Sequence, residues 1–479
     1  MATKNTNTAL SIERHPQFNE MITVWEKMRD CQSERLVKIR DNSTNNINNL
    51  TTKRYLPKTS GMNADFANGE TAYQSKKTRA EFPANLVDTE RQMLGLLAKN
   101  SLKIELPTKL EPFNNSMTDD GEDINALNAR INEEQLITSR VGLLWDIQAK
   151  APSGKMPYVV IYSSERIINW QTYINGEDEK FSWVIIDISD YEANPKTGAW
   201  EWTYIYKVLN IDDKGYYTYE FKGQEKDINL SIAPENAVYP DINGKTISEI
   251  PFTICNASSV GACVENPILE PLADSCLKYY RNDADYQELI FMQTIAILCQ
   301  TGLESADIER IKQLSVTDGF ASNSKDAKCY FSEVSGNGLA ESRLNLENAK
   351  KDMINRGISL LEAGASESGE ALSIRLTTKT ANLSTVATNA AMAIEKMLKI
   401  VARWMTGINE DEIIVKSNND FTDNTVKVED LVRLSQLIDM GDFTREDFYN
   451  ELKRAGRTKY GTFEDWNVNT EAANIGIGM

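Results

Sequence analysis

The chain has 479 residues and a mass of 53.9 kDa, which allows about two to four domains of ordinary size. Apolar residues make up 41% of it, so a substantial core is expected. Its 52 Lys and Arg stand against 70 Asp and Glu, a formal net charge of −18. Because tight wrapping of nucleic acid needs an excess of basic residues, this composition argues against that class of function.

The residue inventory also limits catalysis and metal binding. His15 is the one histidine, so a Ser-His-Asp or Cys-His arrangement would have to use it, and we interpret it as a surface residue. No glycine-rich segment has a phosphate-binding spacing, and the six cysteines include no C-x-x-C pair. We therefore expect no catalytic residues, no cofactor, no metal and reduced thiols. Carboxylates are plentiful, so composition alone leaves a two-carboxylate hydrolase open.

No segment predicts membrane insertion or secretion. The longest apolar run, 289–299, is too short to span a bilayer, and residues 1–16 lack the apolar core of a signal sequence. We expect no membrane association.

In the N-terminal part, apolar residues recur at helical spacing in three segments. They predict helices at 17–40, 83–99 and 124–148, the last ending in Val141-Gly142-Leu143-Leu144-Trp145. The residues between the second and third of these helices, 101–123, are rich in proline and acid and predict a connection.

From 157 to 255 the pattern changes to β-branched and aromatic runs. The runs are 158–162, 183–186, 202–208 and 216–221, and Gly, Asn and Asp turns separate them. This region predicts an antiparallel sheet.

After 265 the chain is predicted to be mainly helical. Asn266 followed by Pro267 is typical of a helix start, and apolar spacing extends that helix over 266–299. A compact insert at 300–338 follows, and a second long helix spans 339–361.

The insert is predicted to hold a helix near 305–314, a polar loop at 319–328 and a strand at 328–334. Beyond the second helix, the small and acidic residues 362–370 predict a flexible loop, which leads into a third helix at 371–405.

The third helix carries a near-heptad apolar seam, which predicts packing against neighbouring helices. Small residues in its first half permit the close backbone approach that a crowded ring interior needs, although a plain core helix within one subunit is the alternative. The seam consists of Leu383, Val386, Ala390, Ile394, Met397, Val401 and Trp404.

A strand at 412–416 and an acidic helical region at 427–456 follow the third helix.

These helices, of about 25–35 residues, are twice the usual length. Long helices of this kind suit subunits that stand side by side in a ring. Extended monomers and coiled-coil dimers also contain them.

Several segments, in this order, resemble the portal protein family of tailed bacteriophages, in a subfamily of uncharacterised phage proteins. Taken singly they are weak, but their number and order over about 15–405 make the resemblance specific. They are Trp25-Glu26-Lys27-Met28-Arg29-Asp30-Cys31, Arg54-Tyr55-Leu56-Pro57, Ile104-Glu105-Leu106-Pro107, Val141 to Asp146, Pro157 to Tyr162 with Ile167 to Trp170, Pro271 to Asp274 with Tyr280 to Tyr286, and Glu333 to Leu339.

The resemblance implies an α+β portal-type fold and a structural role rather than an enzymatic one. Portals form a dodecameric ring at one capsid vertex, through which double-stranded DNA passes without sequence specificity during packaging and ejection. The terminase motor docks on the ring first, and adaptor or tail proteins dock later. The implied location is the virion, or the host cytoplasm during assembly, where major capsid and scaffolding proteins are further partners.

The resemblance also implies a domain plan. The third helix would lead from the tunnel back to the wing. The implied parts are a wing at 1–265 with 406–420, stem helices at 266–299 and 339–361, a clip at 300–338, a tunnel loop at 362–370, a tunnel helix at 371–405, and a crown with the C-terminal tail at 421–479.

An acidic chain limits tight phosphate contacts, so the implied channel would pass DNA without holding it. In the tunnel loop, glycines relax the backbone and acidic residues flank small ones, so the loop could move as DNA slides past. An ordinary solvated loop is the alternative. The residues concerned are Glu362, Gly364, Ser366, Glu367, Ser368, Gly369 and Glu370.

Basic residues interrupt the acidity of the second stem helix. We hypothesise that some of Arg343, Lys350, Lys351 and Arg356 line the channel and make weak, periodic phosphate contacts. Intersubunit salt bridges or a solvated face are the alternatives.

The insert offers polar residues suited to docking a motor or adaptor. They are Asn323, Ser324, Lys325 and Asp326.

Two other classes of function compete with the portal interpretation. An acidic α+β hydrolase with paired carboxylates would be a compact monomer or small oligomer with a concave pocket. Another phage head–tail structural protein, such as an adaptor or scaffold, would assemble only with partners.

Overall fold

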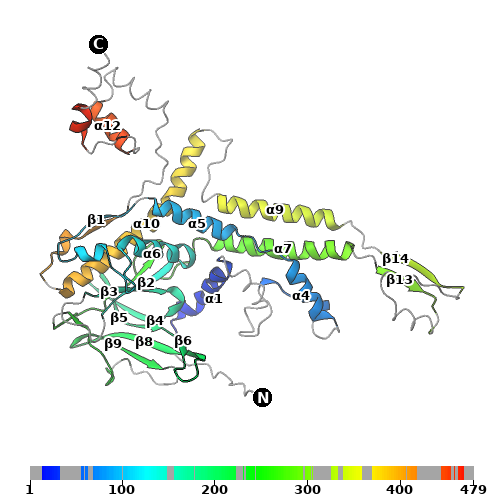
Figure 1. Ribbon diagram of the computed structural model, residues 1–479, viewed down its shortest axis with the longest axis horizontal. Coiled ribbons are helices and arrows are strands. Elements are labelled where there is room, and N and C mark those ends of the chain that lie inside the picture. Colours follow the sequence, from blue (N-terminus) through cyan, green and yellow to red (C-terminus); the bar gives the residue numbers. More distant parts are fainter. Residues whose placement is uncertain are drawn as a thin grey trace, which may run out of the picture. The chain divides into compact units, whose positions relative to one another are not determined.

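The computed structural model describes residues 13–32, 55–58, 60–62, 68–99, 101–147, 156–176, 178–222, 230, 233–242, 244–294, 297–303, 305, 325–332, 338–358, 369–405, 407–417, 444–454, 458 and 462–468. The chain forms two compact units, Met1–Asn419 and Asp420–Met479. The first combines long helices with antiparallel sheets, so the expected α+β class is confirmed (Figure 1).

The described residues of the N-terminal part include the helices α1 (Pro16–Cys31), α4 (Gly69–Arg79), α5 (Asn85–Ala98) and α6 (Ile124–Thr138). The helix expected at 17–40 ends at Cys31 because Gln32 has an extended backbone (φ −69°, ψ 137°), and 33–40 lie outside the described residues. The sequence analysis did not predict α4, because that helix has almost no apolar periodicity and is held by charge, as described below.

The helix predicted over 124–148 is wrong in its second half. Ser139 takes a left-handed conformation (φ 56°) that ends α6, and its carbonyl accepts a hydrogen bond from the Ala257 N–H. Strand β2 (Arg140–Asp146) follows at the centre of a sheet, and all its residues up to Trp145 are buried. A strand buried on both faces does not alternate, which is why its apolar run resembled a helix.

The remaining strands confirm the antiparallel region predicted over 157–255. The expected run 202–208 is two strands, because the ladder breaks at Tyr204. A three-stranded sheet has the order β12 (Phe252–Asn256), β2, β3 (Tyr158–Ser163), and a four-stranded sheet has the order β4 (Ile167–Asn175), β5 (Asp178–Asp187), β8 (Ile205–Asp212), β9 (Gly215–Lys222). Three two-stranded ribbons join β6 (Asp190–Ala193) to β7 (Trp200–Thr203), β10 (Asp241–Ile242) to β11 (Lys245–Thr246), and β1 (Lys103–Glu105) to β15 (Ile414–Lys416).

The long helix α10 (Gly369–Met405) packs its second half into the core of this one subunit. Every residue of the predicted apolar seam is buried there. Helix α10 contacts helices α6 and α5, as expected, and also strands β12 and β15 of the same subunit. Ala390, Ala391 and Ala393 leave room for the helix to approach the sheet closely.

Polar side chains fix α10 in this position. Trp145 Nε1 donates to the Met397 carbonyl at 2.6 Å, and Trp404 Nε1 donates to the Lys245 carbonyl at 2.9 Å. Asn389 Nδ2 donates to the Ala257 carbonyl at 2.9 Å. Buried groups that satisfy one another in this way specify a single arrangement of helix and sheet.

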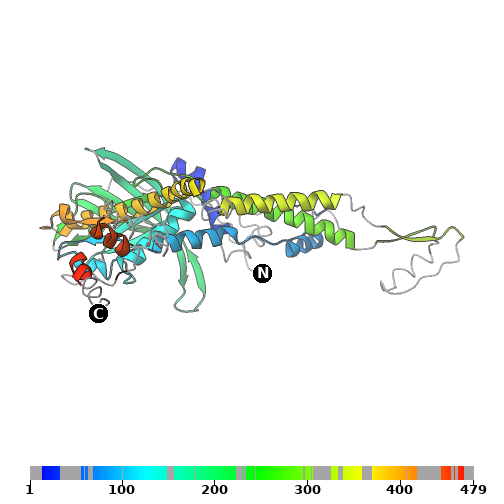
Figure 2. The ribbon, with the colours of Figure 1, turned by 90° about the horizontal axis from the view of Figure 1, so that it is seen from above.

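Helices α7 (Glu270–Thr294) and α9 (Leu339–Ile358) lie side by side, and the strands β13 (Ile297–Thr301) and β14 (Lys328–Ser332) form the ribbon between them in the chain (Figures 1 and 2). The helix expected at 266–299 is therefore too long at both ends. Asn266 and Pro267 precede the helix, where the Pro267 carbonyl accepts from the Glu270 N–H, and residues 297–299 belong to β13. The expected strand at 328–334 is present as β14 over Lys328–Ser332, and residues 333–334 lie outside the described residues. The helix expected near 305–314 also lies outside them, except for its first residue.

Ion pairs hold α4 and α1 to α7. Lys76 Nζ lies 2.6 Å from Asp285 and is itself buried, and Arg79 pairs with Glu288. Lys27 of α1 bonds Glu270 at 2.8 Å and Asp274 at 2.7 Å. One side of α7 is thus occupied by N-terminal segments and another by α9.

The second unit contains α12 (Arg445–Arg454), within the helical region expected at 427–456. The Thr444 hydroxyl accepts from the Asp447 N–H at the start of this helix, which is an N-cap contact. Trp466 lies against Phe448, Tyr449 and Phe463. In the first unit, the strand expected at 412–416 is shorter, since a helical turn occupies Glu410–Glu412 and β15 begins at Ile414.

Candidate functional site

The outward face of α9 is the candidate site that the sequence analysis singled out. Ala349 and Met353 are buried against α7, and Leu346 is half-buried between them and the start of the helix. This narrow contact leaves most of α9 exposed in the single subunit. The exposed face carries four basic and three acidic side chains, namely Arg343, Lys350, Lys351 and Arg356 against Glu341, Glu347 and Asp352.

All four predicted basic residues of α9 are therefore accessible to a ligand in this subunit. Arg343 Nε lies 3.7 Å from Glu347 Oε1, a pair more than half exposed on both sides, which is worth little and leaves the guanidinium available. With four positive and three negative side chains, α9 has a net charge of +1 on a chain of −18. It is thus a locally basic surface on an acidic molecule.

Of the predicted tunnel-loop residues, Glu362, Gly364, Ser366, Glu367 and Ser368 lie outside the described residues. Gly369 and Glu370 are the first residues of α10, so this helix starts two positions earlier than expected.

Two of the four predicted docking residues of the insert are among the described residues. Asn323 and Ser324 lie outside the described residues, whereas Lys325 and Asp326 are exposed in the turn before β14. Gly302, just after β13, has a φ of +72°, and a Cβ there would lie 2.1 Å from the Asp326 carbonyl oxygen. The backbone just after β13 therefore lies directly beside the turn before β14.

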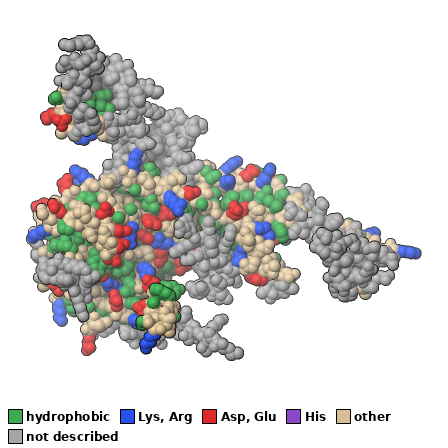
Figure 3. All heavy atoms as spheres, in the orientation of Figure 1, with side chains coloured by type: hydrophobic (Ala, Val, Ile, Leu, Met, Phe, Trp, Pro, Cys, Tyr) green, Lys and Arg blue, Asp and Glu red, His purple; other side chains and the backbone are tan. Residues whose placement is uncertain are grey.

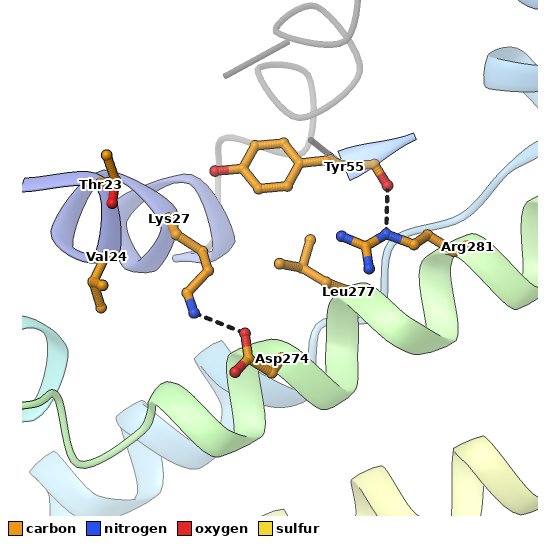
Figure 4. Close-up of a pocket in the computed structure, with 7 residues that line it drawn as sticks. All are labelled: Thr23, Val24, Lys27, Tyr55, Asp274, Leu277 and Arg281. Atoms are coloured by element: carbon orange, nitrogen blue, oxygen red, sulfur yellow. Dashed lines mark hydrogen bonds and ion pairs between the residues drawn. The ribbon is translucent and has the colours of Figure 1, made fainter. Parts of the chain in front are cut away.

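The sequence analysis gave no sign of a cavity of about 300 Å³ between α1, Tyr55 and α7 (Figure 4). Lys27 and Asp274 form an ion pair within it, and Arg281 Nε donates to the Tyr55 carbonyl at 3.0 Å. Burial would lower the pKa of Lys27, but the hydrogen bonds that its ammonium donates to Asp274 and Glu270, together with their negative charges, outweigh it and raise the pKa. The lining residues are Thr23, Val24, Lys27, Tyr55, Asp274, Leu277 and Arg281.

This cavity does not have the chemistry of a hydrolase with two carboxylates. Asp274 is its single lining carboxylate, and Lys27 bonds both Asp274 and the neighbouring Glu270. A two-carboxylate mechanism needs both carboxyl groups in the same site. Its residues come from segments far apart in the sequence, so no local motif could have revealed it.

His15 is partly exposed, as expected of a surface residue, and it also contributes to the start of α1. Its Nδ1 accepts from the Gln17 N–H at the start of α1, and its ring stacks on Trp170 with 3.9 Å between centroids. Partial burial and the nearby Arg140 guanidinium lower the pKa of His15. Within the described part of the chain, no three His, Cys, Asp or Glu residues are placed to hold a metal ion.

A buried charge cluster joins α1, α5 and α6. Arg29 bonds Glu134 at 2.5 Å and Glu165 at 2.7 Å, so its charge is shared by two carboxylates. Glu90, only 2% exposed, accepts a 2.7 Å hydrogen bond from Gln32 Nε2. Burial, assisted by the nearby Glu133, raises the pKa of Glu90 to about 7.

We expect Glu90 to make the stability of the first unit depend on pH. The pKa of Glu90 in the folded chain lies above the ordinary 4.5, so the folded state binds the proton more tightly than the unfolded state. The resulting stabilisation, measured against high pH, is fully present below pH 4.5 and is lost as pH rises through 7. Glu90→Gln should therefore stabilise the protein by roughly 2 kcal/mol at pH 8 and by little at pH 5. Thermal melts at both pH values check this, with the exposed Glu341→Gln as control. An unchanged pH dependence in Glu90→Gln would contradict it.

Among the described residues, no helix is both long enough and apolar enough to cross a membrane.

Comparisons with known proteins match a family model and solved structures. A family model described as a domain of unknown function, DUF4055, matches residues 267–405, which include α7, the β13–β14 ribbon, α9 and α10. A solved structure titled "Neck of empty GTA particle computed with C6 symmetry" is 12% identical, with a TM-score of 0.34, over 81% of this chain and 98% of that one. A TM-score of this size does not establish a common fold. A search of curated proteins found no match.

Proposed function

We propose that this chain is the subunit of a portal ring, the head-to-tail connector of a tailed bacteriophage, which conducts DNA during packaging and ejection. The observation that carries the proposal is the order of elements from α7 to α10. In the chain, two long antiparallel helices flank a small β ribbon, and a third long helix returns the chain to the β-rich body. The same order is implied by the portal resemblance of the sequence.

The packing of the helices supports this function. The second half of α10 is fixed in the core by Trp145, Asn389 and Trp404, so the segment before it is attached to a rigid support. In α9, most of the surface remains uncovered in one subunit, as expected of a helix that faces a channel or a neighbouring subunit. An acidic chain whose exposed helix α9 carries only a small positive charge suits a conduit that must not retain DNA.

In this proposal the chain has no catalytic centre, and a separate terminase supplies the energy for packaging. Terminase and then adaptor or tail proteins would dock near Lys325 and Asp326, which are exposed in the turn before β14. Capsid and scaffolding proteins would surround the ring in the virion.

Mass photometry and negative-stain imaging of the purified full chain test the proposal. We expect rings with a central hole and about twelve copies of the 53.9 kDa chain, near 650 kDa. Because some rings need capsid components to nucleate, the measurement is repeated after coexpression with the capsid and scaffolding proteins of the same genome. A chain that stays monomeric under both conditions would contradict the proposal, and smaller complexes formed with partners alone would favour another head–tail structural protein.

A further inference from the structure

The β6–β7 ribbon has one aromatic and one acidic face. Its register pairs Tyr191 with Trp202 and Ala193 with Trp200, so these four side chains share one face. Tyr204, directly after the ribbon, extends the aromatic series, with 6.2 Å between its ring and that of Trp202. The opposite face consists of Asp190, Glu192, Glu201 and Thr203.

Local hydrogen bonds build this ribbon into a defined shape. At its base, Ser189 Oγ accepts from the Ile205 N–H at 3.1 Å, and the Ile188 N–H donates to the Ile205 carbonyl at 2.9 Å. At its tip, the Asn194 N–H donates to the Ala199 carbonyl at 2.7 Å, and Gly198 supplies the positive φ of 68° that the turn needs. The aromatic face is therefore preorganised, which lowers the entropic cost of binding.

Much of the aromatic face is exposed in the single subunit. Trp200 is 69% exposed, Tyr191 58%, Trp202 45% and Tyr204 40%. Since such side chains bury about 150–250 Å² each, on the order of 400 Å² of aromatic surface is left in water. A two-stranded ribbon is marginally stable alone, and an apolar patch of this size commonly marks an interaction site. Figure 3 shows hydrophobic side chains gathered where Figure 1 places β6.

The charges around the ribbon indicate which partner fits. Asp190, Glu192 and Glu201 are exposed, and Lys222, 3.6 Å from Glu192, only partly offsets them. A second copy that docked through the same ribbon would bring like-charged carboxylates toward these, and nucleic acid would be repelled by them as well. A basic partner is favoured, because aromatic faces attract ammonium and guanidinium groups and the acidic edges add Coulomb attraction.

We propose that the aromatic face of the β6–β7 ribbon docks a partner protein that presents lysine or arginine side chains around an apolar contact. The partner's apolar groups cover Trp200 and Trp202, and its cations reach the ring faces and the carboxylates at the ribbon edges. This surface does not depend on ring assembly, so its test is separate from that of the portal proposal.

The test uses the full chain and two synthetic probes, an alternating Arg–Leu hexapeptide and its Glu–Leu counterpart. Binding is followed by tryptophan fluorescence and by calorimetry at low and high salt. We expect the basic peptide to bind at least about tenfold more tightly than the acidic one, with an affinity that falls as salt rises. The double variant Trp200→Ser/Trp202→Ser should weaken binding of the basic peptide about tenfold or more. The control Ile174→Ser, which changes a residue 80% exposed on β4, should leave that binding unchanged.

Three results would overturn the proposal. They are equal binding of both peptides, no measurable binding of either, and concentration-dependent self-association of the chain that the double tryptophan variant abolishes. The last result would assign the face to a second copy instead. Because the substituted side chains are exposed, the variants should melt within a few degrees of the natural chain, and thermal melts verify that they are folded.

Discussion

Gly142→Ala is expected to destabilise the first unit by about 1–3 kcal/mol, although it adds one methyl group. Gly142 lies in β2 between Ile254 of β12 and Tyr162 of β3. A Cβ at this position would lie 2.6 Å from a ring carbon of Phe252 and 2.7 Å from the end of Ile167. Both side chains are buried, so neither can move aside without displacing its own neighbours. Thermal and urea unfolding measure the loss.

Gly95→Ala is the matched control for that substitution. Gly95 lies on the exposed side of α5, and no atom lies within 4 Å of the position that a Cβ would take. Here alanine should stabilise the protein by about 0.5–1 kcal/mol, because it restricts the unfolded chain and favours the helix. If both variants changed stability by the same amount and sign, overpacking at Gly142 would not be the cause.

Gly142 also illustrates what could be predicted from sequence. Strands in the region from 158 to 221 were predicted because β-branched and aromatic runs there stand between turn residues. β2 is buried at every position up to Trp145, and its run Val141 to Trp145 therefore resembled a buried helix. The left-handed Ser139 that separates α6 from β2 is not glycine or asparagine, so the break carried no local signal.

Long-range partners were the second limit on prediction. The apolar seam of α10 was predicted correctly, whereas its partner, the β12 sheet, is set by contacts such as that from Asn389 to Ala257. Likewise α7 ends at Thr294 because the following residues pair with β14, more than thirty residues later in the chain. Helix α4 has Lys76 and Arg79 where an apolar stripe would be expected, because its partners on α7 are carboxylates.

For the candidate site, the sequence predicted the basic positions on α9 but not their surroundings. The basic residues are exposed because α9 contacts α7 over a narrow strip. The burial of Ala349 and Met353 in the folded chain shows where that strip lies. The cavity beside Lys27 and the aromatic face of the β6–β7 ribbon were missed, because each needs residues that come together only in the folded chain.

Lys350→Gln/Lys351→Gln is expected to lower the yield of DNA-filled particles, or their retention of DNA, by about tenfold, while rings assemble normally. If α9 lines the channel, a ring of twelve subunits would lose twenty-four positive charges from one level of the conduit. Phosphate contacts at this level would be weak and repeated, so that DNA is guided without being held. Nuclease-protected DNA per particle and ring mass are the two measurements.

The matched control for these lysines is a second double neutralisation, Lys103→Gln/Lys416→Gln. Lys103 and Lys416 are exposed and face each other across the β1–β15 pair, away from α9 in the fold. The control makes the same change in net charge, so an effect confined to Lys350 and Lys351 would be positional. If rings failed to assemble in the α9 variant, these lysines would instead form intersubunit ion pairs. Normal rings with normal DNA content would remove α9 from the channel wall.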